Sequence, residues 1–117
     1  MAKGYAIDLS INFELNSAKI SPSHADRLET LYNLMKFKPT LEVLVEGHSD
    51  RLGNEKLNIL LSNQRASSVK KYLISKGISS SRIKAKGYGS SKPAFDYAPG
   101  ANENPLNRRI QIVVLNN

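Results

Sequence analysis

The sequence predicts an α+β fold, a two-layer β-α-β-α-β-β sandwich in which two helices cover one face of a four-stranded mixed sheet. Four short segments alternate apolar and polar residues, as half-buried strands do, and two longer segments have apolar residues at helical spacing. Each helical segment lies between two strand segments, and such units cross over with the same hand, which brings both helices to one face. No linker or internal repeat divides the 117 residues, so residues 1–117 are expected to form a single domain.

The first strand and the first helix are expected over residues 5–13 and 21–37. In the strand segment, apolar residues alternate with polar ones. Ser21 followed by Pro22 is typical of a helix start, because the hydroxyl caps free N–H groups and proline fits the first turn. The helix is expected to end before Pro39, because proline disfavours the helical conformation of the residue that precedes it. The apolar residues of the helix recur at its period: Ala25, Leu28, Leu31, Tyr32 and Met35.

The second strand and the second helix are expected over residues 41–46 and 55–76. The strand runs into Gly47-His48-Ser49-Asp50, so these four residues are expected at its carboxyl end. The helical segment is rich in helix-forming residues and is followed by Gly77, the residue type that most often ends a helix.

The last two strands are expected over residues 82–88 and 109–115, with a long loop over residues 89–107 between them. Loops of this length inside compact domains are usually functional or mobile. The residues of these strands that should face inward are Ile83, Ala85, Ile110, Ile112 and Val114. Four glycines predict tight turns and close approach to the strands: Gly47, Gly53, Gly87 and Gly89.

The second helix carries three polar residues on its apolar side. When the helix is projected at about 100° per residue, its apolar residues share one broad arc: Leu57, Leu61, Ala66, Val69, Tyr72 and Leu73. Asn58, Ser62 and Arg65 fall inside that arc. An arginine turned toward a core is costly unless it is paired and hydrogen-bonded, so an anionic group is expected to meet Arg65.

Two interpretations of this pattern stay open. In the structural one, Arg65 closes an internal salt bridge with Asp50, and Asn58 caps loop backbone. In the functional one, Asp50 and Arg65 flank a pocket, where the guanidinium binds a ligand carboxylate and the carboxylate accepts an ammonium group. Such a pair matches a zwitterionic amino-acid group. Arg108, in the Asn107-Arg108-Arg109 segment, either joins the rim of that pocket or belongs to a solvated strand edge.

Composition excludes several classes of function. The chain has no Cys, which rules out disulfides, thiol catalysis and cysteine metal sites. Its formal charge is +7, but the lysines are scattered and no basic block is interleaved with aromatic residues, which argues against a nucleic-acid partner. His48 and Asp50, with Glu46, are too few ligands for a typical metal site, so no metal or cofactor is expected. No catalytic motif is present, so we do not expect an enzyme. The alternatives are a small metal-dependent hydrolase using His48 and Asp50, and a basic nucleic-acid-binding domain.

The motifs after the second strand and in the second helix resemble those of one family. They are Gly47-His48-Ser49-Asp50, Gly53, Asn58, Leu61-Ser62, Arg65-Ala66, Val69, Gly87-Tyr88-Gly89, Pro93 and Asn107-Arg108-Arg109. With these spacings the chain resembles the OmpA-like peptidoglycan-binding domain over nearly its whole length, from Ile11 to Ile112.

The resemblance implies an OmpA-like fold and a non-covalent, non-catalytic hold on peptidoglycan, through the diaminopimelate group of the stem peptide. Asp50 and Arg65 occupy the positions that grip the ligand in this family. By the same resemblance, Asn58 orients the site and Arg108 lies beside it.

Two positions depart from the family pattern. Ser49 stands where Thr is commoner and keeps the hydroxyl. Asn16 lies in the loop before the first helix, which is often acidic in the family, so it would contribute a neutral contact.

Domains of this kind usually belong to outer-membrane barrels, lipoproteins or flagellar stator proteins. The resemblance therefore implies the periplasm and cell envelope of a Gram-negative bacterium, with peptidoglycan as partner and membrane attachment only through other parts of the parent protein. Because the sequence shows no export signal, lipidated Cys or membrane span, we expect a domain excised from such a parent. The oligomeric state stays open, with a homodimer as one alternative.

Overall fold

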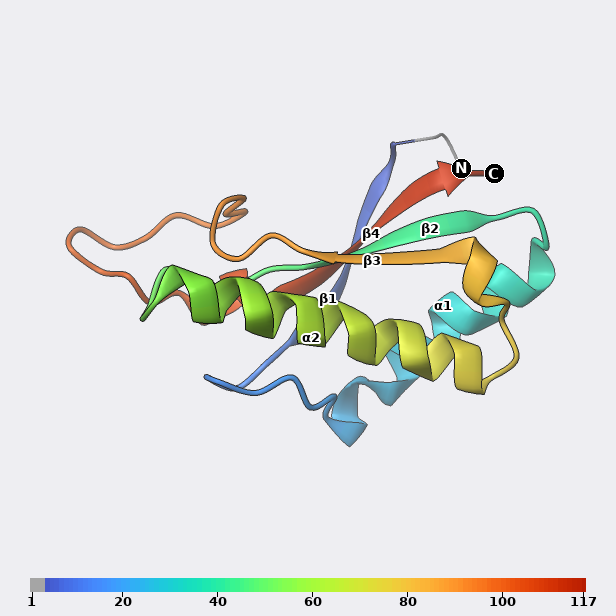
Figure 1. Cartoon of the computed structure of the whole chain (residues 1–117), viewed down its shortest axis with the longest axis horizontal. Coiled ribbons are helices and arrows are strands. Elements are labelled where there is room, and N and C mark those ends of the chain that lie inside the picture. Colours follow the sequence, from blue (N-terminus) through green and yellow to red (C-terminus); the bar gives the residue numbers. More distant parts are fainter. Residues whose placement is uncertain (1–3) are drawn as a thin grey trace.

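The computed structural model describes residues 4–117. Its elements follow the predicted order β-α-β-α-β-β (Figure 1). The strands and α-helices are β1 (Ala6–Asn12), α1 (Ala25–Phe37), β2 (Glu42–Gly47), α2 (Glu55–Ser75), β3 (Ile83–Gly87) and β4 (Arg109–Asn116). Short 3-10 turns precede α1, β3 and β4: η1 (Pro22–His24), η2 (Ser80–Arg82) and η3 (Pro105–Asn107).

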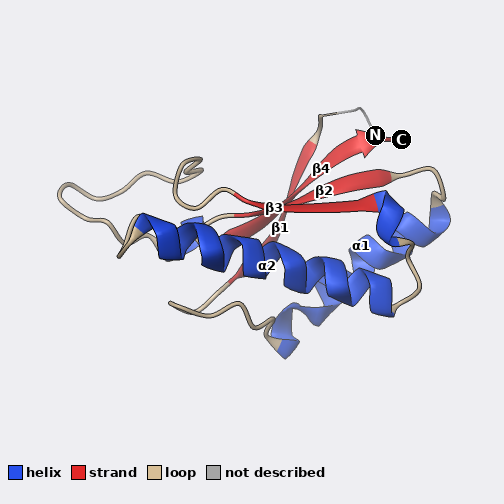
Figure 2. Cartoon of the chain, in the orientation of Figure 1, coloured by secondary structure: helices blue, strands red, loops and turns tan. Residues whose placement is uncertain are grey.

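The strands form one mixed sheet in the order β1-β4-β2-β3 (Figure 2). β4 lies between β1 and β2 and is antiparallel to both, whereas β2 and β3 run parallel. This insertion of the last strand brings the start of β4 beside the end of β2. Gly47 pairs with Ile110, and the His48 N–H donates to the carbonyl of Arg109 at 2.9 Å.

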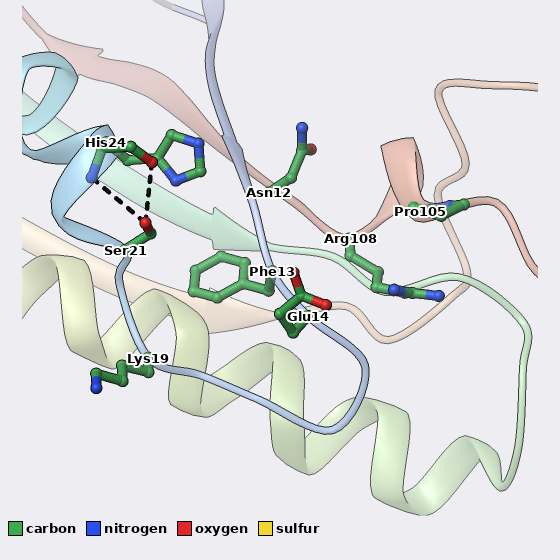
Figure 3. A pocket seen from close by; sticks show the side chains of 9 residues that line it. Asn12, Phe13, Glu14, Lys19, Ser21, His24, Pro105 and Arg108 are labelled. Atoms are coloured by element: carbon green, nitrogen blue, oxygen red, sulfur yellow. Dashed lines mark hydrogen bonds between the residues drawn. The ribbon is translucent and has the colours of Figure 1, made fainter.

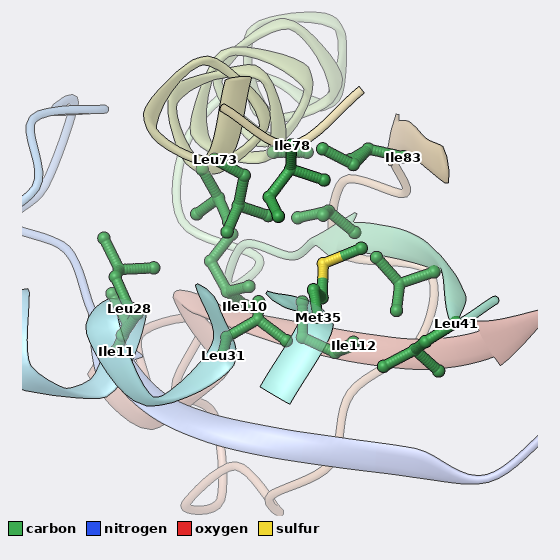
Figure 4. Packing of buried hydrophobic residues seen from close by; sticks show 14 of the residues in the cluster. Ile11, Leu28, Leu31, Met35, Leu41, Leu73, Ile78, Ile83, Ile110 and Ile112 are labelled. Carbon is green, nitrogen blue, oxygen red and sulfur yellow. The ribbon is translucent and has the colours of Figure 1, made fainter. Parts of the chain in front are cut away.

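Both helices pack on the same face of the sheet, and the hydrophobic core fills the space between the two layers (Figures 1 and 4). Its fully buried members include Ile11, Leu28, Met35, Val45, Val69, Leu73, Ile110 and Ile112. The predicted α+β sandwich is confirmed. Among residues 4–117, no helix is both long enough and apolar enough to cross a membrane.

Three residues predicted to face inward are exposed instead. Leu57 is 56% exposed, because the first turns of α2 pass beyond the end of β2, where Gly47 meets Ser62. Ala85 is exposed because β3 is an edge strand of the sheet. Ala25 is exposed at the first position of α1.

Helix α1 begins later than the sequence predicts. Ser21 does act as a cap, but of the 3-10 turn η1, where its Oγ accepts from the Ser23 N–H at 3.3 Å. The α-helix proper begins at Ala25. The end of α2 is as predicted, since Gly77 has a φ of +106°, a conformation that glycine adopts without strain.

Helix α2 lies very close to the sheet at two of the predicted glycines. A Cβ atom added to Gly47 would lie 2.0 Å from the backbone oxygen of Ser62, and one added to Gly87 would lie 2.2 Å from the backbone nitrogen of Asn63. The approach is sealed by hydrogen bonds, because Ser62 Oγ accepts from the Gly89 N–H at 2.9 Å and Asn63 Oδ1 accepts from the Gly87 N–H at 2.7 Å. Ser62 therefore faces the sheet and links α2 to the ends of β2 and β3.

Candidate ligand-binding site

Arg65 of α2 is buried and is held by backbone carbonyls rather than by a carboxylate. Its side chain is 1% exposed. Nε donates to the Ser17 carbonyl at 2.8 Å, and Nη1 and Nη2 donate to the carbonyls of His48 and Glu14, each at 3.3 Å. The salt bridge between Arg65 and Asp50 that the structural interpretation predicts is therefore wrong. Partial charges on three carbonyl oxygens meet the guanidinium in place of a full negative charge.

Arg65 keeps its charge and has N–H donors beyond the three that bind carbonyls. Burial lowers the pKa of Arg65 to about 10. The positive charge of Arg108 also lowers it, and the negative charge of Asp50 raises it. The guanidinium therefore stays charged at neutral pH. It has five N–H donors, and three of them go to the carbonyls. The ring of Phe13 covers one side, with its centroid 5.0 Å from the guanidinium carbon.

Asp50, just beyond the end of β2, pairs with Arg108 of the segment before β4. Its side chain is 2% exposed, and Oδ2 accepts from Arg108 Nε at 3.1 Å and from the Asn104 N–H at 3.3 Å. Arg108 Nη2 also donates to Glu103 Oε2 at 2.7 Å, and the Glu103 side chain is about half exposed. The hydrogen bonds that Asp50 accepts within the described chain fall on one oxygen, which leaves Oδ1 for a ligand.

The interpretation of Asn107-Arg108-Arg109 as a solvated strand edge is wrong. All three residues are buried, with at most 5% exposed, because β4 is an interior strand. Asn107 Oδ1 holds the loop by accepting from the backbone N–H groups of Ala94 and Phe95. Arg108 pairs with Asp50, so it lies beside the candidate site.

Ser49 and Asn58 hold the backbone of Asp50. Ser49 Oγ donates to the Asp50 carbonyl at 3.0 Å, and Asn58 Nδ2 donates to the same oxygen at 3.3 Å. The prediction that Asn58 caps loop backbone is confirmed. Asn16 is exposed in a turn with a φ of +59°. It borders the site through its neighbour Ser17, whose carbonyl binds Arg65.

His48 belongs to a separate polar cluster with Glu46. Its Nε2 lies 3.1 Å from Glu46 Oε1, and its ring stacks on Tyr88 with 5.5 Å between the ring centroids. Burial lowers the pKa of His48, the charge of Arg109 lowers it further, and Glu46 opposes both. Within residues 4–117, no group of three or more His, Asp or Glu side chains is placed to hold a metal ion.

Sequence reasoning missed the residues that contribute backbone groups to the site. Glu14 and Ser17 offer carbonyls to Arg65, and Asn104 offers an N–H to Asp50. A side-chain pattern carries no signal for a backbone contact. The one sequence feature that points to these contacts is Arg65 on the apolar side of α2. A buried guanidinium needs hydrogen-bond acceptors, which the backbone can supply.

Comparison with known proteins places the chain in a family. The family model of the OmpA family matches residues 12–108, which include every group of the site described above. The chain belongs to the OmpA family. Its OmpA-like fold is shared with the OmpA-like domain of FopA1 from Francisella tularensis, with a TM-score of 0.80 at 20% identity over 96% of this chain and 75% of that one.

Two named relatives of this OmpA-family chain are envelope proteins. It is 35% identical to the peptidoglycan-associated lipoprotein of Buchnera aphidicola over 106 residues, and 33% identical to outer membrane porin F of Pseudomonas fluorescens over 114 residues. The alignments cover 91% and 97% of this chain. They cover 60% of the lipoprotein and 35% of the porin, so the chain spans only part of the length of these relatives.

Proposed function

We propose that this chain binds bacterial peptidoglycan non-covalently and without catalysis, through the diaminopimelate group of the stem peptide. The observation that carries this proposal is the convergence of three buried charged residues, Asp50, Arg65 and Arg108. Backbone contacts hold Arg65 and the backbone of Asp50, and carboxylates hold Arg108. Membership of the OmpA family and the name of the peptidoglycan-associated lipoprotein support it.

The end of a diaminopimelate side chain carries an ammonium and a carboxylate on one carbon. The free oxygen of Asp50 suits the ammonium, and the two N–H donors that Arg65 does not give to carbonyls suit the carboxylate. Both ligand charges are needed, because a charge buried without its partner is costly. Ser49 and Asn58 act on the ligand indirectly, by holding the backbone of Asp50. Asn16 lies in the turn between Glu14 and Ser17, whose carbonyls hold Arg65.

The ligand enters a site that is closed in this structure. Asp50 and Arg65 are almost wholly buried, with the carbonyls of Glu14 and Ser17 on Arg65 and the backbone N–H of Asn104 on Asp50. Binding therefore requires one of these two segments to move aside. The metal-hydrolase and nucleic-acid alternatives gain no support, since His48 is engaged with Glu46 and the buried arginines face backbone and carboxylates rather than solvent.

We place the chain in the periplasm of a Gram-negative bacterium, where it would anchor its parent protein to the cell wall. Two relatives named as an outer membrane porin and a peptidoglycan-associated lipoprotein support this location. Attachment to the membrane would come from other parts of the parent. We treat residues 1–117 as one binding domain.

Co-sedimentation with purified peptidoglycan sacculi tests the proposal. Asp50→Asn removes the negative charge and keeps the side-chain shape, and Arg65→Lys keeps the positive charge and loses the planar fork. Each variant is expected to bind sacculi at least tenfold more weakly, because a buried charge-assisted contact is worth about 2–5 kcal/mol. Free meso-diaminopimelate should release the wild-type chain from the sacculi.

Lys71→Gln is the matched control, since Lys71 is exposed on α2 and outside the site. Thermal melting followed by circular dichroism separates a loss of binding from a loss of fold. Full binding by both site variants, or failure of free meso-diaminopimelate to compete, would overturn the proposed site.

A further inference from the structure

A cavity of about 380 Å³ adjoins the candidate site (Figure 3). It lies between the end of β1, the segment that leads through η1 into α1, and η3. Its polar wall includes Lys19, Ser21, Ser23, His24 and Arg108. A volume of this size is in the range of small-ligand pockets.

The cavity and the candidate site share walls. Arg108 lines the cavity and also binds Asp50. Phe13 and Glu14 line it too, while the ring of Phe13 covers the Arg65 guanidinium and the carbonyl of Glu14 accepts from Arg65. A ligand held by Asp50 and Arg65 therefore has its adjoining part within reach of the cavity.

The polar lining combines the amide of Asn12 and the carboxylate of Glu14 with several groups that the fold leaves partly unused (Figure 3). The ammonium of Lys19 forms no ion pair in the described chain, and Nδ1 of His24 is buried without a hydrogen-bond partner there. The hydroxyls of Ser21 and Ser23 lie 2.9 Å apart and hydrogen-bond to each other, so one of the two hydroxyl protons remains free. Arg108 is already paired with Asp50 and Glu103. Lys19 is therefore the lysine or arginine of the lining that can pair with an incoming anion.

We propose that this cavity is a second subsite, which binds the D-alanine that follows the diamino acid in a tetrapeptide stem. Lys19 pairs with the terminal carboxylate of that residue, and the hydroxyls of Ser21 and Ser23 bind its polar backbone. The inference rests on the proposed function, since it takes the diamino acid to be seated on Asp50 and Arg65. It adds a specificity-determining residue, Lys19, that lies outside the resembling motifs.

Isothermal titration with three ligands tests the subsite: free meso-diaminopimelate, the tetrapeptide L-Ala-D-Glu-meso-diaminopimelate-D-Ala, and that tetrapeptide with its terminal carboxylate amidated. The wild-type chain should bind the tetrapeptide about fivefold more tightly than its amide, the size expected for an ion pair with an exposed lysine. Lys19→Gln should lose that difference and bind both peptides like the amide. Its affinity for free meso-diaminopimelate should be unchanged.

Lys71→Gln, an exposed lysine of α2 away from the cavity, is the matched control and should keep the fivefold preference. If wild type binds the tetrapeptide and its amide equally, or if Lys19→Gln keeps the preference, the second subsite is wrong while the proposed function stands. If free meso-diaminopimelate and the tetrapeptide both fail to bind wild type, the proposed function fails and the subsite with it.

Discussion

Arg65 and Arg82 show two uses of a guanidinium bound by backbone carbonyls in one small fold. Arg82 donates to the carbonyls of Leu41, Met35 and Lys38, and so ties the end of α1 to the start of β2, where free helix carbonyls need donors. Arg65 also binds three carbonyls, but these belong to loops, and a carboxylate lies close enough to affect its pKa. The first arginine ties two elements together, whereas the second is the one that we propose binds a ligand carboxylate.

The sequence predicted the unusual residues of the site better than their partners. Arg65 was found because an arginine on an apolar helix face breaks the expected pattern, and Asn58 was found with its backbone-capping role. The partner of Arg65 was not predictable, since carbonyls of Glu14 and Ser17 leave no trace in side-chain chemistry. The place of Arg108 depends on β4 being an interior strand, which the sequence pattern does not contain.

At the same scale, His48 should make stability depend on pH. Its pKa in the folded state is lowered by burial and by Arg109, so the unfolded chain binds the proton more readily. The stabilising effect is fully present above the unfolded pKa of about 6.5. It is lost as the pH falls below that value toward the folded pKa, by up to about 1.4 kcal/mol per pH unit.

Urea unfolding at pH 7.5 and at pH 5.5 measures this effect in wild type and in His48→Asn. Comparing the two proteins cancels titration elsewhere in the chain. Wild type should lose more free energy of unfolding than His48→Asn over this interval. Equal losses would show that the environment of His48 does not favour its neutral form.

At the scale of elements, the close packing of α2 on the strand ends fixes the site. Gly47 and Gly87 let the helix approach, and Ser62 and Asn63 then hydrogen-bond to the chain around β3. This contact fixes the distance between α2 and the end of β2. Arg65 lies one turn further along α2, so the same contact positions it. The predicted close approach is confirmed, although the sequence could not tell that a helix rather than a strand would make it.

Gly47→Ala should therefore destabilise the fold strongly. The new Cβ would lie 2.0 Å from the Ser62 carbonyl oxygen, so the helix backbone must shift, and we expect a loss of about 3 kcal/mol. Gly100→Ala is the control: its φ of +76° gives strain but nothing lies near its Cβ, so about 1 kcal/mol should be lost. Chemical denaturation measures both losses. Similar values for the two variants would mean that α2 can move away at little cost.

At the scale of the molecule, the strand order brings distant parts of the chain to one end of the sheet. Insertion of β4 between β1 and β2 sets Arg108 against Asp50, 58 residues apart in sequence, while the segments before α1 and before β4 cover the same spot. Element types and their order followed from periodicity. The order of strands in the sheet is a long-range property, which periodicity alone does not contain.

The most direct test of a site that reads both charges of the ligand is a titration with two stem peptides that differ only in the distal carboxylate. These are L-Ala-D-Glu-meso-diaminopimelate and its L-lysine counterpart. Loss of one buried charge-assisted contact, worth about 2–5 kcal/mol, should make the lysine peptide bind at least tenfold more weakly. Equal affinities would contradict the account, because they would show that Arg65 does not bind the distal carboxylate.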